Sequence, residues 1–336
     1  MSNRGLIGLP RGQQSATSGS STLRNLRLFS STLPSPVNHC WVPSTGNIVT
    51  VGGNSNNYEF RSLATGNVVS SGTGYGFQSC CYVPSTNRVF MGIGSTVYTF
   101  DAASGVALTS NGTGNAGLYQ FTYVPTLDEV WVTHNNYTSP NFSRHNNVGG
   151  YLGTYYYNSW SSPQGSCYVA SNQTIVNVFN GSNVMMMTNV ASTGFVGYVR
   201  ATSSNLSNPV GVCWAPSSNQ LYVTNMGSEY LTVFDLNFSV VTSFPMPSTP
   251  SYLVYHEPTD RIYATCQGGA IVIVNPNTNT IVGSIGRSSV QDGVTTVARG
   301  ITGIASIPQT NQLVVSGLSA SNIAVFDAPR DARFMY

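Results

Sequence analysis

Six cysteines are the residues of this chain best suited to redox or metal chemistry. Four of them belong to a motif that recurs along the chain: Cys40, Cys81, Cys167 and Cys213. Each lies three residues before the central residue of its copy, which is a proline in three copies and an alanine in the fourth. We expect equivalent places in repeated units to lie too far apart for the roughly 5.5 Å Cα separation of a disulfide. Cys80 adjoins Cys81, so the two point to opposite faces of a strand. With no Cys-x-x-Cys or Cys/His zinc spacing, the cysteines are predicted to be small buried apolar residues.

The histidines and carboxylates give no sign of a metal or acid–base site. The four histidines are His39, His134, His145 and His256, and none has a second ligand at metal-binding spacing. The eleven acids fall mostly at expected turns and do not cluster as a carboxylate pair would. No Gly-x-Ser-x-Gly elbow or phosphate-binding glycine loop is present. We predict a protein that is not an enzyme and binds no cofactor or metal. The alternative is a hydrolase whose site is assembled from distant loops.

A long aromatic segment is the strongest candidate for a binding surface. Residues 135–163 read NNYTSPNFSRHNNVGGYLGTYYYNSWSSP, which is longer and richer in tyrosine than corresponding parts of the chain. Aromatic side chains among adaptable polar residues are typical of recognition surfaces. The candidate residues are Tyr137, Tyr151, Tyr155, Tyr157 and Trp160. A structural alternative is open, because Tyr155–Tyr157 also fits a tyrosine-rich third strand followed by a long loop.

The first 22 residues form a candidate assembly arm. They contain no acid and many Gly, Ser and Gln residues. The candidate contact residues are Arg4, Leu6, Ile7, Leu9 and Arg11. Two interpretations are open: a flexible terminus, or an arm that becomes ordered on a neighbouring subunit. The arginines are too few and too widely spaced to predict nucleic-acid binding.

The elements that position these residues come from a motif that returns seven times. It consists of an apolar or aromatic strand, a proline, three or four turn residues and a second apolar strand, as in CWVPSTGNIVTV, CYVPSTNRVFMG and CWAPSSNQLYVT. The central residues are Pro43, Pro84, Pro125, Ala170, Pro216, Pro258 and Pro308, which are 41 to 50 residues apart. A repeat of this length with several short strands predicts a β-propeller blade. Seven copies predict an all-β protein with seven blades.

Each repeat divides into four antiparallel strands. Blade five reads VGVCWAP, LYVTNMG, EYLTVFD and SVVTSF, with Ser, Asn, Gly and Pro between the runs. The proline ends the first strand because it has no N–H to donate to the ladder. The aromatic residues that follow the first-strand cysteines, or their equivalents, are expected to pack between blades: Trp41, Tyr82, Tyr123, Tyr168 and Trp214.

The last blade lacks an outer strand, and the beginning of the chain can supply it. LRLFSSTLPSPVNHCWVP, from Leu26, aligns with VVTSFPMPSTPSYLVYHEP, from Val240. We predict that residues 23–31 form the outer strand of blade seven, close to Ala324. This closes the ring and removes an open sheet edge. The alternative is that residues 333–336 supply that strand.

The composition narrows the class of protein. Only 7% of residues are charged, against about 25% in typical soluble proteins, and all thirteen basic residues are arginines. Such a surface is expected to be neutral and polar and to respond weakly to pH or salt. The start of the chain has no apolar core of a secretory signal, and no apolar run is long enough to span a bilayer. The predicted domains are an arm over 1–22 and a propeller over 23–336.

One stretch resembles a known repeat family. LYVTNMGSEYLTVFD, with the run Tyr222-Val223-Thr224-Asn225, resembles the YVTN family of propeller repeats, and CYVPSTNRVFM and RIYATCQGGAIVIVN resemble weaker copies. The resemblance spans residues 26–328. It implies a scaffold of the kind found in archaeal and bacterial surface proteins. Some relatives resemble lactonases, but no matching active-site pattern occurs here.

These features predict a non-enzymatic structural protein of a virion surface. An exposed type of composition without an export signal suggests a protein that leaves the cell as part of a virus particle. Its expected partners are neighbouring virion or surface-layer subunits and a host-surface glycan or protein, with no nucleic acid and no membrane span. One alternative is a propeller at the extracellular cell surface or envelope that binds glycans or surface proteins. A lactonase-like hydrolase is the other.

Overall fold

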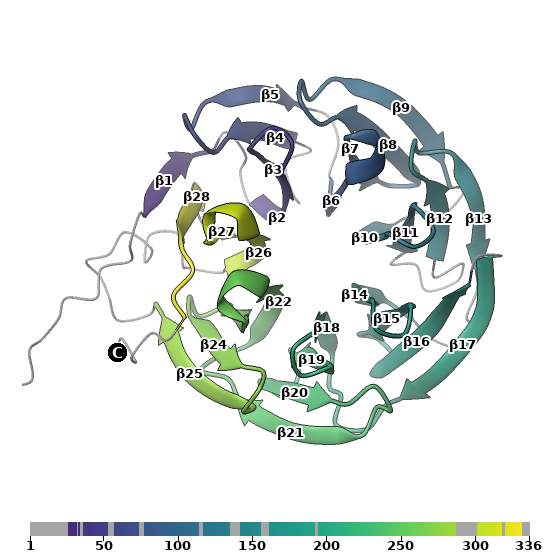
Figure 1. The fold of residues 1–336 in the computed structure, drawn as a ribbon, viewed down its shortest axis with the longest axis vertical. Coiled ribbons are helices and arrows are strands. Elements are labelled where there is room, and N and C mark those ends of the chain that lie inside the picture. Colours follow the sequence, from purple (N-terminus) through teal and green to yellow (C-terminus); the bar gives the residue numbers. More distant parts are fainter. Residues whose placement is uncertain are drawn as a thin grey trace, which may run out of the picture.

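The computed structural model confirms the propeller. It describes residues 26–31, 33, 36–52, 57–73, 77–113, 117–134, 142–155, 161–191, 194–286, 301–317 and 320–330. Seven antiparallel sheets of four strands each stand around a common centre (Figure 1). Among the residues described, no helix has the length and apolar character needed for a transmembrane span.

Each blade runs from an inner first strand to an outer fourth strand. Blades one and two contain β2 (Pro36–Val42), β3 (Asn47–Gly52), β4 (Asn57–Ser62), β5 (Val68–Gly72), β6 (Cys80–Val83), β7 (Arg88–Ile93), β8 (Thr96–Asp101) and β9 (Ala107–Gly112). Blades three and four contain β10 (Leu118–Val124), β11 (Glu129–His134), β12 (Phe142–Asn146), β13 (Tyr151–Tyr155), β14 (Pro163–Val169), β15 (Thr174–Phe179), β16 (Val184–Ala191) and β17 (Gly194–Thr202). Blades five and six contain β18 (Pro209–Ala215), β19 (Gln220–Asn225), β20 (Tyr230–Phe234), β21 (Val240–Pro245), β22 (Pro250–His256), β23 (Arg261–Cys266), β24 (Ile271–Asn275) and β25 (Thr280–Ile285). Blade seven contains β26 (Ile301–Ile307), β27 (Gln312–Gly317), β28 (Ala320–Asp327) and β1 (Arg27–Ser30).

The turn between the first and second strands ends on a left-handed residue in every blade. These residues have φ between 50° and 70° and are Gly46, Asn87, Asp128, Gln173, Asn219, Asp260 and Asn311. Glycine, asparagine and aspartate adopt this conformation at the lowest cost. Three of the turns are short 3-10 helices, η1 (Pro84–Thr86), η2 (Glu257–Thr259) and η3 (Pro308–Thr310).

The left-handed residues correct the predicted register of blade six. In η1 and η3 the proline is the first residue of the turn, whereas in η2 that place belongs to Glu257 and Pro258 comes second. Pro258 is therefore not equivalent to the other central prolines. The repeat is better counted from the left-handed residues, because their backbone conformation marks the same point in every blade.

The ring closes as predicted from the sequence. β1 pairs antiparallel with β28, and Leu28 lies opposite Ala324. The strand order of this sheet is β1-β28-β27-β26 (Figure 1). The alternative in which residues 333–336 supply the outer strand is wrong, because β1 occupies that place.

The apolar core lies between the blades. In one cluster Tyr222 of β19 packs with Ile262 and Ala264 of β23 in the next blade. In another, Tyr263 of β23 packs with Leu313 of β27. A fully buried large apolar side chain contributes about 1.5–3 kcal/mol. Adjacent blades therefore stabilise one another, and the ring holds its outer strands in fixed places.

Candidate interaction surface

The outer strands carry almost no charge. They follow the circumference of the ring (Figure 1), and β5, β9, β13, β21 and β25 contain no charged residue. In the described sheets each of these strands pairs only with the third strand of its own blade. Natural proteins usually protect such edges with charged side chains, because an exposed edge is a template for pairing with another chain.

Among the side chains whose exposure the structure describes, most of the exposed large apolar residues lie on one part of this circumference. We call them the outer arc; each is between 39% and 59% exposed, and they are Leu28, Val68, Val69, Val106, Leu108, Val148, Tyr151 and Leu152. They lie on β1, β5, β9 and β13 or on the turns that lead into these strands. The outer arc therefore extends over blades seven, one, two and three.

Contacts between neighbouring blades make the outer arc continuous. In blades one, two and three, the turn before the fourth strand packs against the fourth strand of the preceding blade. Ser70 Oγ of β5 donates a hydrogen bond of 3.3 Å to the carbonyl oxygen of Gly105, in the turn before β9. Asn111 Nδ2 of β9 donates one of 2.9 Å to the carbonyl oxygen of Gly149, in the turn before β13. These bonds bring Val106 beside β5 and Val148 beside β9.

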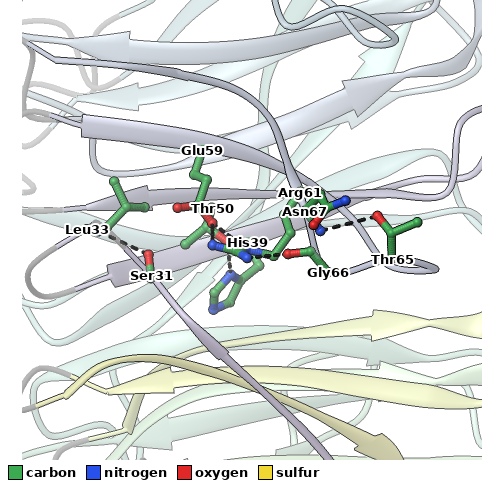
Figure 2. Close-up of polar contacts among 9 residues, drawn as sticks. All are labelled: Ser31, Leu33, His39, Thr50, Glu59, Arg61, Thr65, Gly66 and Asn67. Carbon is green, nitrogen blue, oxygen red and sulfur yellow. Dashed lines mark hydrogen bonds and ion pairs between the residues drawn. The ribbon is translucent and has the colours of Figure 1, made fainter.

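The first junction of the outer arc depends on Gly66, in the turn before β5. Its φ is +76°, and a Cβ atom there would lie 2.8 Å from Cε1 of Phe29 on β1. Arg61 donates to the carbonyl oxygen of Gly66 and, at 2.6 Å, to the buried carboxylate of Glu59 (Figure 2). The Arg61 guanidinium also lies 5.5 Å from the centre of the Phe29 ring. The closing strand and blade one are thus held together beneath Leu28 and Val68.

Of the predicted binding residues, Tyr151 lies in the outer arc, and Tyr155 is partly buried and engaged in contacts within its own blade. The hydroxyl of Tyr155 accepts a 2.9 Å hydrogen bond from Arg144, and its ring stacks on Trp131 at 6.2 Å. Arg144 also donates two bonds to Glu129, of 2.7 Å and 2.5 Å. Tyr155 belongs to the fourth strand, so the alternative that places it in a third strand is wrong.

The other candidates lie outside the described residues. They are Tyr137, Tyr157, Trp160 and the arm residues Arg4, Leu6, Ile7, Leu9 and Arg11. The sequence analysis missed the valines and leucines of the outer arc. The available signal was the pair of apolar residues that opens several fourth strands, as in VVSSG and VVTSFP, where one side chain of each pair must point outward.

The most enzyme-like geometry pairs a serine with a histidine between blades seven and one. His39 Nε2 lies 2.7 Å from Ser316 Oγ, and His39 Nδ1 lies 2.9 Å from Thr50 Oγ1 (Figure 2 shows His39 with Thr50). Ser316 donates its hydroxyl proton to the carbonyl oxygen of Pro36 at 3.1 Å. With its proton directed at Pro36, Ser316 Oγ is placed to accept a hydrogen bond from Nε2 of His39. This arrangement is that of a structural contact.

Burial supports that interpretation. Ser316 is 0% exposed and His39 is 4% exposed, so a substrate has no access to either. Burial lowers the pKa of His39 from 6.5 to about 3. Among the described residues, no group of three or more His, Cys, Asp and Glu side chains is placed to hold a metal ion.

Comparisons with known proteins show the fold and nothing finer. No protein-family model matches the chain, and no curated protein sequence matches it. One similar solved structure is described as the "Crystal Structure of Mitotic Checkpoint Complex". The similarity has a TM-score of 0.74 at 13% sequence identity and covers 98% of this chain and 99% of that chain. At this identity, the shared property is the seven-bladed architecture.

Proposed function

We propose that this chain is a non-enzymatic structural protein of a virion surface that packs edge to edge with copies of itself. Its scaffold is a propeller with YVTN-type repeats. The observation that supports this function best is the outer arc: eight exposed apolar residues, continuous over four blades, seven of which lie on or beside the uncharged strands β5, β9 and β13. Single exposed apolar residues are common, but continuous patches of this kind mark interaction sites.

The chemistry of the outer arc favours a second copy as the partner. An edge with so few charges gains little from a charged partner and would leave that partner's charges poorly solvated. The chain itself supplies the matching surface, because only 7% of its residues are charged and five of its outer strands carry none. Two such edges can pair their backbone groups and bury their valines and leucines.

The virion surface is the setting that this composition supports. A neutral polar exterior without lysine suits a protein that works outside the cell or packed against neighbours. Regular packing of copies leaves other parts of the ring for attachment to a host glycan or protein.

Density-gradient fractionation of the producing culture tests the location. We expect the protein, followed by mass spectrometry, to sediment with nuclease-protected nucleic acid. Migration with cell envelopes or as a free protein would contradict the virion proposal and favour a cellular surface propeller.

Sedimentation velocity of the purified chain tests the edge contact. We expect concentration-dependent association that Leu108→Lys on β9 abolishes, because the substitution places a charge in the pairing edge. Val241→Lys provides the matched control, since Val241 is also exposed and, like Leu108, is the second residue of an outer strand, but it lies in blade five, outside the outer arc. A wild-type chain that stays monomeric, or equal effects of the two substitutions, would contradict a role for the outer arc.

A further inference from the structure

The first strands of neighbouring blades face each other in a fixed register. At the interface between blades three and four, Thr122 Oγ1 lies 2.8 Å from Ser166 Oγ. Thr122 is six residues before the left-handed residue of its own blade, Asp128, and Ser166 is seven residues before Gln173. We number first-strand positions back from the left-handed residue of each blade. The residue six positions before it (minus six) points toward the next blade, and the residue seven positions before it (minus seven) points back toward the previous one.

A second contact confirms the direction of the minus-seven residue. His39 is seven residues before Gly46, and it bonds back to Ser316 in blade seven. The same register holds at both interfaces, so it follows from the geometry of the ring.

Cys40 and Cys80 occupy these facing places between blades one and two. Cys40 is six residues before Gly46, and Cys80 is seven residues before Asn87. Cys80 Sγ points back to blade one, where it lies 3.8 Å from the carbonyl oxygen of Val49. The two side chains belong to one buried cluster, their thiol groups interact, and both are free thiols in this structure.

The other first-strand cysteines face apolar residues. By the same register Cys81 faces Phe121, Cys167 faces Val212 and Cys213 faces Leu253. Each pair shares an apolar cluster. Among the described first strands, Cys40 and Cys80 are thus the one pair of cysteines that face each other across an interface.

We propose that Cys40 and Cys80 are a cross-linking site: they form a disulfide that joins blade one to blade two when the chain folds in the presence of a small disulfide oxidant such as oxidised glutathione. One thiolate attacks the glutathione disulfide, giving a mixed disulfide and releasing one reduced glutathione. The second thiolate then attacks the protein sulfur of the mixed disulfide and releases the other. The two thiols lose two protons and two electrons, and these appear in two molecules of reduced glutathione.

The bond has to form before the two blades pack. In the folded chain Cys40 is 8% exposed and Cys80 is 5% exposed. Burial, followed by the interaction with Cys40, raises the pKa of Cys80 well above its usual value, so the reactive thiolate is scarce in the folded dithiol. The same burial protects a disulfide, once formed, from reductants. The cross-link therefore records the redox conditions under which the chain folded.

Refolding under two redox conditions tests the proposal. The purified full chain is unfolded and refolded either with oxidised and reduced glutathione or with dithiothreitol, and free thiols are then alkylated in denaturant. We expect the glutathione sample to have lost two hydrogens, with the peptides of Cys40 and Cys80 joined and Cys81, Cys167, Cys213 and Cys266 alkylated. Its thermal midpoint should rise by about 5 °C, because the bond restricts the unfolded chain.

The interface between blades three and four supplies matched variants. Cys40→Thr with Cys80→Ser copies the Thr122–Ser166 pair, so this variant should fold without forming the cross-link. In that background, Thr122→Cys with Ser166→Cys should restore a cross-link between blades three and four. The proposal is wrong if Cys40 and Cys80 stay alkylatable, or pair with other cysteines, under conditions in which the transferred pair cross-links.

Discussion

Ser85 Oγ in blade two donates a hydrogen bond of 2.6 Å to a carboxylate oxygen of Asp128 in blade three. The same oxygen accepts a bond of 2.8 Å from the hydroxyl of Tyr123, and the other carboxylate oxygen accepts one of 2.6 Å from Asn147. Asp128 is the left-handed residue of its turn, so one side chain fixes both the turn and the neighbouring blade.

This arrangement recurs around the ring. The bonds from the preceding blade are Ser44 to Asn87, Ser171 to Asn219 and Ser217 to Asp260. The bonds from the first-strand aromatic residue of the same blade are Tyr82 to Asn87, Trp214 to Asn219 and Tyr255 to Asp260. The prediction that the aromatic residues after the cysteines pack between blades is confirmed by the apolar clusters. Each of these residues adjoins a cluster formed by its own blade and the preceding one: Trp41, Tyr82, Tyr123, Tyr168 and Trp214.

The effect of substituting Asp128 on stability can be predicted from the residues that other blades have at the same position. Asp128→Asn is expected to cost less than about 1 kcal/mol of unfolding free energy, because Asn87 and Asn219 fill the same place and only the bond from Asn147 loses its acceptor oxygen. Asp128→Ala should cost about 2 kcal/mol, since alanine strains at positive φ and Ser85 and Tyr123 lose their acceptor. Urea denaturation measures both values. Equal effects of the two substitutions would show that the contact does not stabilise the ring.

The buried histidines predict a loss of stability in acid. Burial lowers the pKa of His39 from 6.5 to about 3, and those of His145 and His256 to about 4. Between pH 6.5 and the lowered pKa values, these histidines are therefore protonated in the unfolded chain and neutral in the folded chain. The contribution of His39 is complete above pH 6.5 and falls by about 1.4 kcal/mol per pH unit down to about pH 3.

Urea denaturation at pH 7, 5.5 and 4 measures this loss. The midpoint should fall steadily with pH, and more gently in His39→Gln, which removes one of the titrating groups. Identical slopes for the wild type and His39→Gln would mean that His39 does not titrate during unfolding. The weak pH response expected from the composition concerns the surface, where few groups titrate.

At Gly165 the backbones of blades four and five approach each other closely. A Cβ atom there would lie 2.6 Å from the carbonyl oxygen of Val210 and 2.9 Å from the backbone nitrogen of Val212. Gly165→Ala should therefore separate the two blades and cost about 1–3 kcal/mol. Gly112→Ala is the control, because a Cβ atom there meets nothing within 4 Å. Thermal unfolding followed by circular dichroism compares the two, and a Gly165→Ala midpoint equal to that of Gly112→Ala would contradict the expected overlap.

The ion pair of Arg144 and Glu129 should be costly to break and insensitive to salt. Their side chains are 10% and 12% exposed. Glu129→Gln is expected to cost about 3 kcal/mol, because it leaves a nearly buried guanidinium without its counter-charge. The cost should be similar in 0.1 M and 1 M NaCl, since screening acts mainly on exposed pairs. The exposed bond from Arg88 to the carbonyl oxygen of Val148 is the control, and Arg88→Met should cost less than about 1 kcal/mol. A cost for Glu129→Gln that disappears in 1 M NaCl would indicate a solvated pair.

The architecture could be predicted from the sequence because each repeat contains its own turn signal. Proline followed by polar residues and Asn, Asp or Gly predicts the turn, and the spacing of the turns predicts the number of blades. Strand β1 was also predictable, since its run RLFS resembles an outer strand and blade seven lacked one. Blade six misled the register because Pro258 stands second in its turn, and only the φ of Asp260 shows this.

The candidate site was less predictable because it depends on contacts between blades. No local pattern shows that the turn at Gly105 packs on Ser70, so the outer arc could not be assembled from the sequence. The contacts of Tyr155 were not predictable for a similar reason: its partner Arg144 lies on the neighbouring strand of the sheet. The structure was also needed to show that Cys40 and Cys80 face each other. Counting from the prolines matched cysteines at equivalent positions of different blades, and equivalent positions are not the ones that face each other across an interface.

The pairing of β1 with β28 also has a consequence for synthesis on the ribosome. Arg27 is translated well before its partner Val325, which lies in the last of the seven blades. Six blades can stack in order, but the circle stays open until Val325 has been translated, and until then both of its end faces remain apolar and exposed. Crowded polysomes would bring such open circles together, so slow elongation favours misassembly between nascent chains, and prompt release favours the correct monomer.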